Sequence, residues 1–531
     1  MVNTRFAATL RLNHLAGTSI IVAAAVLLAI SMTFWHQYAG GNVGKFVPFD
    51  SDSYVYLRLA DTYVNKLPIS NTTFDNPSGR PVSWASIVPG ITAAIQKTTR
   101  SFGLVLPTPL CGMLMVALVT MIAVASAIIT AVKWGLNKQL FASMLALGVF
   151  SPAAFWMWQP SRIDHQVIAW AAFLLAGLAA GGMTTSKNTS GFIFGIMAGI
   201  AVWTGPLATI PSLILLVLAA YTPGKPASRQ WLYFGAASAT TIVVGYFLDQ
   251  REASWVLNMA GPSPLWALAF ISGSLIMCGF AASRRLLIYI GVIIGAVPAS
   301  VFWVSAQNFA MLDPAVGEML NGIQEMEPFQ WSQFAGFAIG WALLVAISGP
   351  KKVLLSAVGL AGLVLAAWHA RNAALLMPAL ATYGAVIATV NNAKYLRILT
   401  LLAIAQTVIA LAASVSPVGA GSIWREARAL PQNIQGGVFL GDFDATLAAA
   451  YYFNGTSIGG LFWENATLAG EALTVMSGTE SAAKEFCQKH AVTHVLVNAG
   501  GPPNFAASAK WLHPVAVSGN LIAYRADYQT K

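Results

Sequence analysis

Residues 104–130 read LVLPTPLCGMLMVALVTMIAVASAIIT and include no charged side chain. A helix needs about 20 mostly apolar residues to cross the roughly 30 Å hydrocarbon core of a bilayer, so this stretch is long enough to span a membrane. Comparable apolar runs recur along the chain. We predict about 13 membrane spans, near residues 17–37, 104–130, 139–159, 165–184, 190–204, 206–221, 231–248, 264–282, 286–304, 332–349, 353–368, 373–390 and 398–415.

The composition supports the same class. Of the 531 residues, 57% are hydrophobic and only 9% are charged, whereas soluble domains carry about 25% charged residues. We therefore predict a polytopic α-helical membrane protein and exclude soluble, secreted and disordered chains. The first apolar run is longer than the apolar core of a signal peptide, so we expect it to be retained as a span. Three scattered cysteines form neither a disulfide framework nor a metal-binding spacing.

The net charge of +10 has a membrane explanation, so we predict no nucleic-acid partner. If the N-terminus is cytoplasmic, every inner loop is basic, as the positive-inside rule requires. These loops contain Arg5, Arg11, Lys133, Lys138, Lys187, Lys225, Arg229, Arg284, Arg285, Lys351, Lys352, Lys394 and Arg397. All acids before residue 416 then fall on the outer side, namely Asp50, Asp52, Asp61, Asp75, Asp164, Asp249, Glu252, Asp313, Glu318, Glu325 and Glu327. That rule does not require the acidic half of the pattern, which therefore points to function.

The last part of the chain differs in kind. An odd number of spans places residues 416–531 outside the cytoplasm. We predict a small soluble α/β domain there, with β-rich runs at 437–440 and 494–498 and a helix at 480–490. Residues 1–415 then form the membrane domain, including a long first outer loop at 38–103.

That first outer loop carries the first candidate site residues. Asp50 and Asp52 follow closely on a membrane span, where carboxylates are costly unless they bind a cation or transfer protons. In the alternative interpretation, Asp50 or Ser51 caps a helix that begins at Tyr54.

Three further segments add polar side chains on the same face. The short loop 158–166 holds Asp164 and His165, although Asp164 could instead cap the next helix. The loop 313–330 contains Glu325 among other acids and could be an ordinary solvated turn. Arg371 begins a span from the outside, where it could bind a phosphate or anchor the helix at the headgroups. Together these residues suit group transfer from a phospholipid carrier beside a divalent cation.

The ordered set resembles a known family, the GT-C glycosyltransferases, and within it the catalytic subunit of oligosaccharyltransferase and its bacterial relatives. The segments that carry the resemblance are Asp52-Ser53-Tyr54 followed by Arg58, Ser161-Arg162-Ile163-Asp164-His165-Gln166, Gln324-Glu325-Met326-Glu327-Pro328, and Arg371. The number of spans and an external C-terminal domain also match this family.

The resemblance implies roles for individual residues. Asp52, Asp164 and Glu325 would be catalytic carboxylates and ligands of a divalent metal, Mg²⁺ or Mn²⁺. Arg371 and Arg80 would bind the donor phosphate. Residues near the acceptor or behind these groups would be Asp50, Tyr54, Trp84, His165, Gln166 and Asp442.

Two departures from the family pattern bear on function. Gln166 replaces the second acid of the D-x-D or D-x-E motif. The W-W-D-Y-G signature, which reads the Ser or Thr of a protein acceptor, is absent, and residues 440–444 read LGDFD instead. We therefore predict an inverting transferase that uses a polyprenyl-(pyro)phosphate-linked sugar and a glycan, lipid or polysaccharide acceptor, in the inner membrane of a bacterium. The alternatives are an oligosaccharyltransferase acting on protein Asn and a lipid-linked sugar transporter, although the inverted repeats common in transporters are not evident.

Overall fold

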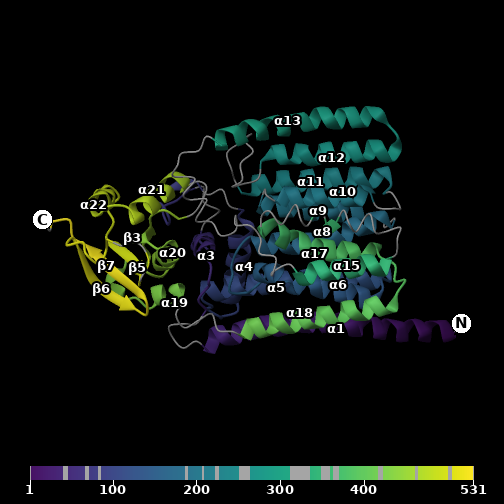
Figure 1. Ribbon diagram of the computed structural model, residues 1–531, viewed down its shortest axis with the longest axis horizontal. Coiled ribbons are helices and arrows are strands. Elements are labelled where there is room, and N and C mark those ends of the chain that lie inside the picture. Colours follow the sequence, from purple (N-terminus) through teal and green to yellow (C-terminus); the bar gives the residue numbers. More distant parts are fainter. Residues whose placement is uncertain are drawn as a thin grey trace.

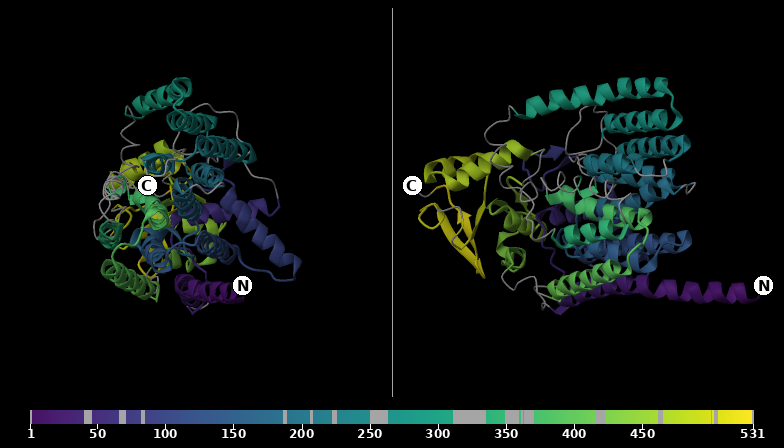
Figure 2. Two further views of the ribbon diagram at one scale, coloured as in Figure 1. Left: turned by 90° about the vertical axis from the view of Figure 1, so that its right-hand side faces the viewer. Right: turned by 45° about the vertical axis from the view of Figure 1, so that its right-hand side comes forward.

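The computed structural model shows a bundle of long, roughly parallel helices with a small sheet at one end (Figure 1). The sheet and the N-terminal end of the first helix lie at opposite ends of the molecule (Figures 1 and 2). The structure describes residues 2–39, 46–65, 71–81, 85–185, 189–205, 208–221, 226–249, 263–310, 335–348, 359–360, 362, 370–415, 422–460, 465–499, 501 and 505–529.

Within these ranges, six helices are long and apolar enough to cross a membrane. They are α1 (Val2–Ala39), α5 (Thr108–Trp134), α8 (Gln166–Thr184), α11 (Ser228–Leu248), α12 (Pro264–Ala282) and α18 (Ala393–Val415). Other apolar helices are α6 (Lys138–Phe150), α9 (Ser190–Thr204), α10 (Thr209–Tyr221), α13 (Arg285–Ala310), α15 (Ala335–Ser348) and α17 (Ala370–Ile387). The chain is thus a polytopic helical membrane protein. The apolar helices of the described residues do not confirm the predicted number of 13 spans.

One predicted span is wrong in its extent. The run 139–159 is divided into α6 and a short helix, α7 (Pro152–Met157). Ser151 between them is extended, with φ −61° and ψ 140°. Proline disfavours the α conformation in the residue before it and begins helices readily, so Pro152 ends one helix and starts the next.

Close helix packing centres on α8, whose apolar window is 94% buried. A Cβ added at Gly177 would lie 1.9 Å from the backbone oxygen of Ala379 on α17, and one at Gly181 would meet Val386. Glycine therefore permits the backbones of α8 and α17 to touch. The pairing of 177 with 379 and of 181 with 386 also shows that the two helices run in the same direction.

The predicted first outer loop is largely folded. It contains helix α3 (Ser51–Tyr63), the antiparallel pair β1 (Asn71–Thr72) and β2 (Arg80–Pro81), and helix α4 (Ile87–Ser101). These elements lie at the end of the bundle that faces the sheet (Figure 1).

The C-terminal part forms a five-stranded mixed sheet of order β4-β3-β5-β7-β6. Its elements are α19 (Ile423–Arg428), η4 (Gln432–Ile434), β3 (Val438–Gly441), α20 (Phe443–Tyr452), β4 (Thr456–Ser457), α21 (Ala466–Ser477), α22 (Glu480–Lys489), β5 (His494–Asn498), β6 (Leu512–Ser518) and β7 (Leu521–Ala526). β3 is parallel to β4 and β5, whereas β7 is antiparallel to β5 and β6. The two strands and the helix expected from the sequence are therefore present as β3, β5 and α22.

Candidate active site

The N-terminus of α3 holds the first acidic motif. Asp50 is the N-cap residue, and its carboxylate accepts a hydrogen bond of 3.1 Å from the backbone N–H of Asp52. The cap alternative is therefore correct for Asp50, although the helix begins at Ser51 rather than at Tyr54. Asp52 lies in the first turn, where a carboxylate also interacts favourably with the helix dipole.

Two hydrogen bonds join this motif to the second one. The backbone N–H of Phe49 donates to the carbonyl of Ser161 at 3.1 Å. The backbone N–H of Ile163 donates to the hydroxyl of Ser53 at 2.9 Å. Segments more than one hundred residues apart in sequence are thereby fixed side by side.

Arg162 connects the acids of the two motifs. Its Nε pairs with an oxygen of Asp50, and a terminal nitrogen lies 3.4 Å from Asp164. Only 4% of the Arg162 side chain and 1% of the Asp164 side chain are exposed. Because buried charges are stable only when paired, the guanidinium permits two carboxylates to lie together away from water.

Asp164 has a second partner in His165. The Nδ1 atom of His165 pairs with an oxygen of Asp164 and lies 2.9 Å from the hydroxyl of Tyr56 on α3. Helix α8 begins at Gln166, which is buried. His165 occupies the N-cap position without a side-chain cap. The alternative in which Asp164 caps this helix is therefore wrong, because its carboxylate is directed to Arg162 and His165.

The C-terminal unit adds a carboxylate to this site. Asp442 caps α20 by accepting from the backbone N–H groups of Asp444 and Ala445, at 3.0 and 3.2 Å. Asp444 lies near the side chains of Ser51 and Asp50. Burial, followed by the charges of Asp442 and Asp50, raises the pKa of Asp444 to about 7. Asp444 was missed in the sequence, although the Asp442-Phe443-Asp444 spacing was a visible signal.

The same two helices pack through aromatic side chains. Tyr54 is fully buried, donates to the carbonyl of Pro48 at 2.8 Å, and has ring contacts of 5.9 and 5.7 Å with Tyr451 and Tyr452. The hydroxyl of Tyr451 donates to Asp61 at 3.2 Å. In this structure Tyr54 therefore serves to dock α20 onto α3.

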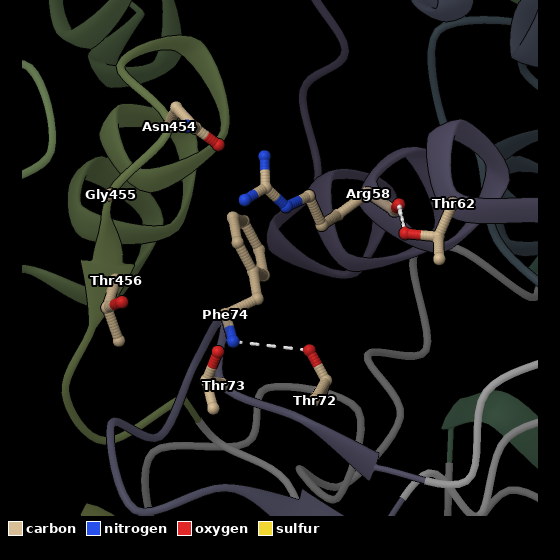
Figure 3. A pocket seen from close by; sticks show the side chains of 8 residues that line it. All are labelled: Arg58, Thr62, Thr72, Thr73, Phe74, Asn454, Gly455 and Thr456. Atoms are coloured by element: carbon tan, nitrogen blue, oxygen red, sulfur yellow. Dashed lines mark hydrogen bonds between the residues drawn. The ribbon is translucent and has the colours of Figure 1, made fainter. Parts of the chain in front are cut away.

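A cavity of about 370 Å³ lies farther along the same two helices. Its walls come from α3, the turn after β1 and the turn between α20 and β4 (Figure 3). The guanidinium of Arg58 lies over the ring of Phe74, 5.6 Å from its centroid. Figure 3 shows Asn454 facing the same space from the C-terminal unit.

No protein-family model matches this sequence, and no curated protein matches it. The fold does match solved structures. The archaeal oligosaccharyltransferase AglB from Archaeoglobus fulgidus, in complex with an inhibitory peptide and a dolichol-phosphate, gives a TM-score of 0.61 at 14% identity, over 90% of this chain and 69% of that chain. The chain has the GT-C fold.

Two other structures of the Archaeoglobus fulgidus enzyme agree with this match. The form tethered through a disulfide bond to an acceptor peptide containing the NVT sequon gives a TM-score of 0.58. The complex with Zn and sulfate gives 0.55. Each is 14% identical to this chain and covers 90% of it, and this chain covers 68% of each. The family resemblance read from the sequence is thereby confirmed at the level of the GT-C fold.

The remaining candidates are placed as follows. Arg371 lies in the first turn of α17, and Arg80 lies in β2, but their side chains are outside the described residues, as are Trp84 and Glu325 entirely. Because α8 and α17 run parallel, Arg371 precedes Ala379 by about 12 Å of helix, and Gln166 precedes Gly177 by about 17 Å. The backbone of Arg371 is therefore at the acidic end of the GT-C bundle.

Proposed function

We propose that the chain is a membrane glycosyltransferase that moves a sugar from a polyprenyl-phosphate or polyprenyl-pyrophosphate carrier to an acceptor, with inversion at the anomeric carbon. The observation that carries this proposal is the joining of the two acidic motifs at one end of a GT-C bundle, through Ser53, Arg162 and His165. The GT-C match supports the same reaction class, because AglB has been solved with a dolichol-phosphate.

The proposed roles follow from charge and position. Asp52 orients or deprotonates the acceptor hydroxyl as it attacks the anomeric carbon. Asp164 is held in place by its pairs with Arg162 and His165. Arg371 and Arg80 bind the donor phosphate, for which a planar guanidinium is well suited.

We also propose a divalent metal at this end of the bundle. The described ranges contain no group of three or more His, Cys, Asp or Glu side chains able to hold a metal. Asp52 and Asp164 nevertheless offer the oxygen donors that Mg²⁺ and Mn²⁺ prefer, and Glu325 is the proposed third ligand. A bound cation would supply positive charge to the leaving phosphate. We expect EDTA to abolish transfer and Mg²⁺ or Mn²⁺ to restore it; full activity in EDTA would contradict a metal requirement.

The proposed acceptor is a glycan, a lipid or a polysaccharide precursor. The segment from the end of β3 into the first turn of α20 carries Asp442 and Asp444 but no tryptophan, so it lacks the tryptophan pair of the sequon-reading signature. A protein Asn acceptor is the second candidate, because a solved enzyme with this fold carries a tethered NVT peptide. Transfer to a synthetic peptide containing Asn-Val-Thr would favour the second candidate.

The membrane location completes the proposal. The chain is an integral membrane protein, and we propose the inner membrane of a bacterium. The basic loops support a cytoplasmic N-terminus. Residues 1–415 then form the membrane domain, and residues 416–531 form an extracytoplasmic domain. Its partners would be the lipid-linked donor and the acceptor.

Asp52→Asn tests the assignment directly. The full-length protein would be placed in nanodiscs and given a radiolabelled lipid-linked saccharide fraction from its native membrane, with transfer to polymeric or lipid products measured. We expect a loss of at least about 100-fold, within the range that general acid–base catalysis contributes. Asp527→Asn, at an exposed carboxylate of the C-terminal unit, is the matched control. Full activity of Asp52→Asn would overturn the role given to Asp52.

A further inference from the structure

The cavity at Arg58 contains a cation that is not ion-paired within the described part of the chain. Phe74 is only 3% exposed, so its ring is fixed and holds the guanidinium by a cation–π contact. Asp61, one turn along α3, accepts hydrogen bonds from Thr108 and Tyr451, and the charge of Arg58 acts on it without an ion pair. The N–H groups of the Arg58 guanidinium are therefore available to a ligand.

The rest of the lining is neutral and polar. Four threonines and Asn454 line the cavity together with Arg58, Phe74 and Gly455. Two of the hydroxyls already serve the backbone: Thr62 donates to the carbonyl of Arg58, and Thr72 accepts from the N–H of Phe74. Asn454 has a left-handed backbone, with φ 48°, which turns its amide toward the cavity (Figure 3). Such a lining suits a ligand that has many hydroxyl groups and one negative charge.

The cavity lies beside the proposed active site. Arg58 follows Asp52 by six residues on α3, or about 9 Å of helix. Asn454 lies just beyond the end of α20, whose length from Asp444 to Tyr452 is about 12 Å. Helices α3 and α20 are tied along this length by Tyr451, which contacts both Tyr54 and Asp61. Arg58 and Asp52 are therefore separated along α3 by a distance comparable to the length of a short saccharide.

We propose that the Arg58 cavity binds an anionic sugar residue, one that bears a carboxylate or a phosphate, within the saccharide that the enzyme handles. The guanidinium would bind the anion through two parallel hydrogen bonds, and Asn454 with the free threonine hydroxyls would bind the sugar hydroxyls. The place of this residue in the reaction rests on the proposed function, whereas its binding does not. The anionic sugar can belong to the donor or to the acceptor.

Binding to the full-length protein in nanodiscs is the primary test. The probes are a fluorescent hyaluronan tetrasaccharide, which contains glucuronate, and a neutral chitotetraose of the same length. We expect the acidic probe to bind more tightly and to weaken as salt screens the charge. Arg58→Gln should weaken it at least about tenfold, the range for a hydrogen bond to a charged group, and Arg58→Lys should have an intermediate effect. Arg525→Gln, at an exposed arginine of β7, should have none.

A second variant leaves the arginine in place. Thr73 is exposed at the rim of the cavity, so Thr73→Glu brings a carboxylate to Arg58 without removing its contact with Phe74. It should reduce binding of the acidic probe as strongly as Arg58→Gln, with an unchanged melting temperature. No binding of the acidic probe, equal binding of the two probes, or unchanged binding in both variants would each overturn the proposal.

Transfer kinetics separate the two sources of the anion. If the donor carries it, Arg58→Gln raises KM for a uronate-containing lipid-linked donor and leaves KM for the acceptor unchanged; the reverse identifies the acceptor. An unchanged KM for both would refute a place for the cavity in the reaction. If the wild type transfers no sugar while binding still depends on Arg58, the proposed function fails and the anion site stands.

Discussion

The bridge made by Arg162 gives the sharpest prediction about how the site is assembled. In Arg162→Met, an unbranched side chain about as long as the aliphatic stem of arginine remains but the guanidinium is lost. Asp50 and Asp164 then lose the cation that they share. The exposed fractions are 14% for Asp50 and 1% for Asp164, so water can solvate the first only in part and the second hardly at all.

The expected cost follows from this burial. Removing one partner of a buried ion pair destabilises a protein by about 3–5 kcal/mol, because an uncompensated buried charge remains. Asp50 also caps α3, so its displacement would loosen the first turn of that helix. Neutralising Asp50 in the same protein should recover part of the loss, with a coupling energy of about 0.5–3 kcal/mol between neighbouring side chains.

A double-mutant cycle measures both quantities. Wild type, Arg162→Met, Asp50→Asn and the double variant would be unfolded in detergent while intrinsic tryptophan fluorescence is recorded, with glycosyl transfer assayed in parallel. The reasoning is refuted if Arg162→Met changes the unfolding free energy by less than about 0.5 kcal/mol, the usual scatter of surface substitutions, or if the two substitutions are additive.

Two other predictions concern the docking of the C-terminal unit and the membrane core. Burial raises the pKa of Asp444 to about 7, above the value of about 3.9 expected in the unfolded chain. Folding therefore binds a proton, and the free energy of unfolding should fall as pH rises from about 4 to about 7. In thermal melts, Asp444→Asn should flatten this dependence on pH, and an unaltered dependence would contradict the prediction. Gly177→Ala places a methyl group 1.9 Å from the oxygen of Ala379 and should cost at least about 1–3 kcal/mol in the same unfolding assay. Gly90→Ala, where nothing lies within 4 Å, should not destabilise, and equal effects of the two alanines would contradict the packing argument.

The fold was predictable where a local property decides it. A long apolar run has few structures available in a bilayer, so most of the run 104–130 specifies a helix on its own, which begins at Thr108. The cap at Asp50 is local too, because the side chain meets a backbone group two residues away. The break before Pro152 was also encoded locally. Because the sequence is apolar on both sides of the proline, hydropathy alone predicts one continuous helix there.

The site was predictable only in part because its partners are distant in sequence. Asp164 was correctly singled out as unusual. The sequence alone does not show that Arg162 forms an ion pair with Asp50, which lies 112 residues earlier in the chain. Asp444 is the extreme case. Its neighbours on α20 are apolar, and its environment exists only once that helix lies against Ser51. Burial on docking raises the pKa of Asp444 more than the charge of its sequence neighbour Asp442 does.

The attachment of the C-terminal unit follows from these same contacts. Asp444 lies near Ser51. In addition, the backbone N–H of Ser457 donates to the carbonyl of Phe74 at 2.8 Å. The side chain of Asn465 bonds to that of Asn76 at 3.1 Å. All of these partners belong to the segment between α1 and α5, so the sheet is held by the first loop of the chain. The Arg58 cavity is therefore built jointly by two regions some four hundred residues apart. The acidic site also needs Arg162 and Asp164 from a third segment, so no region alone contains a complete site.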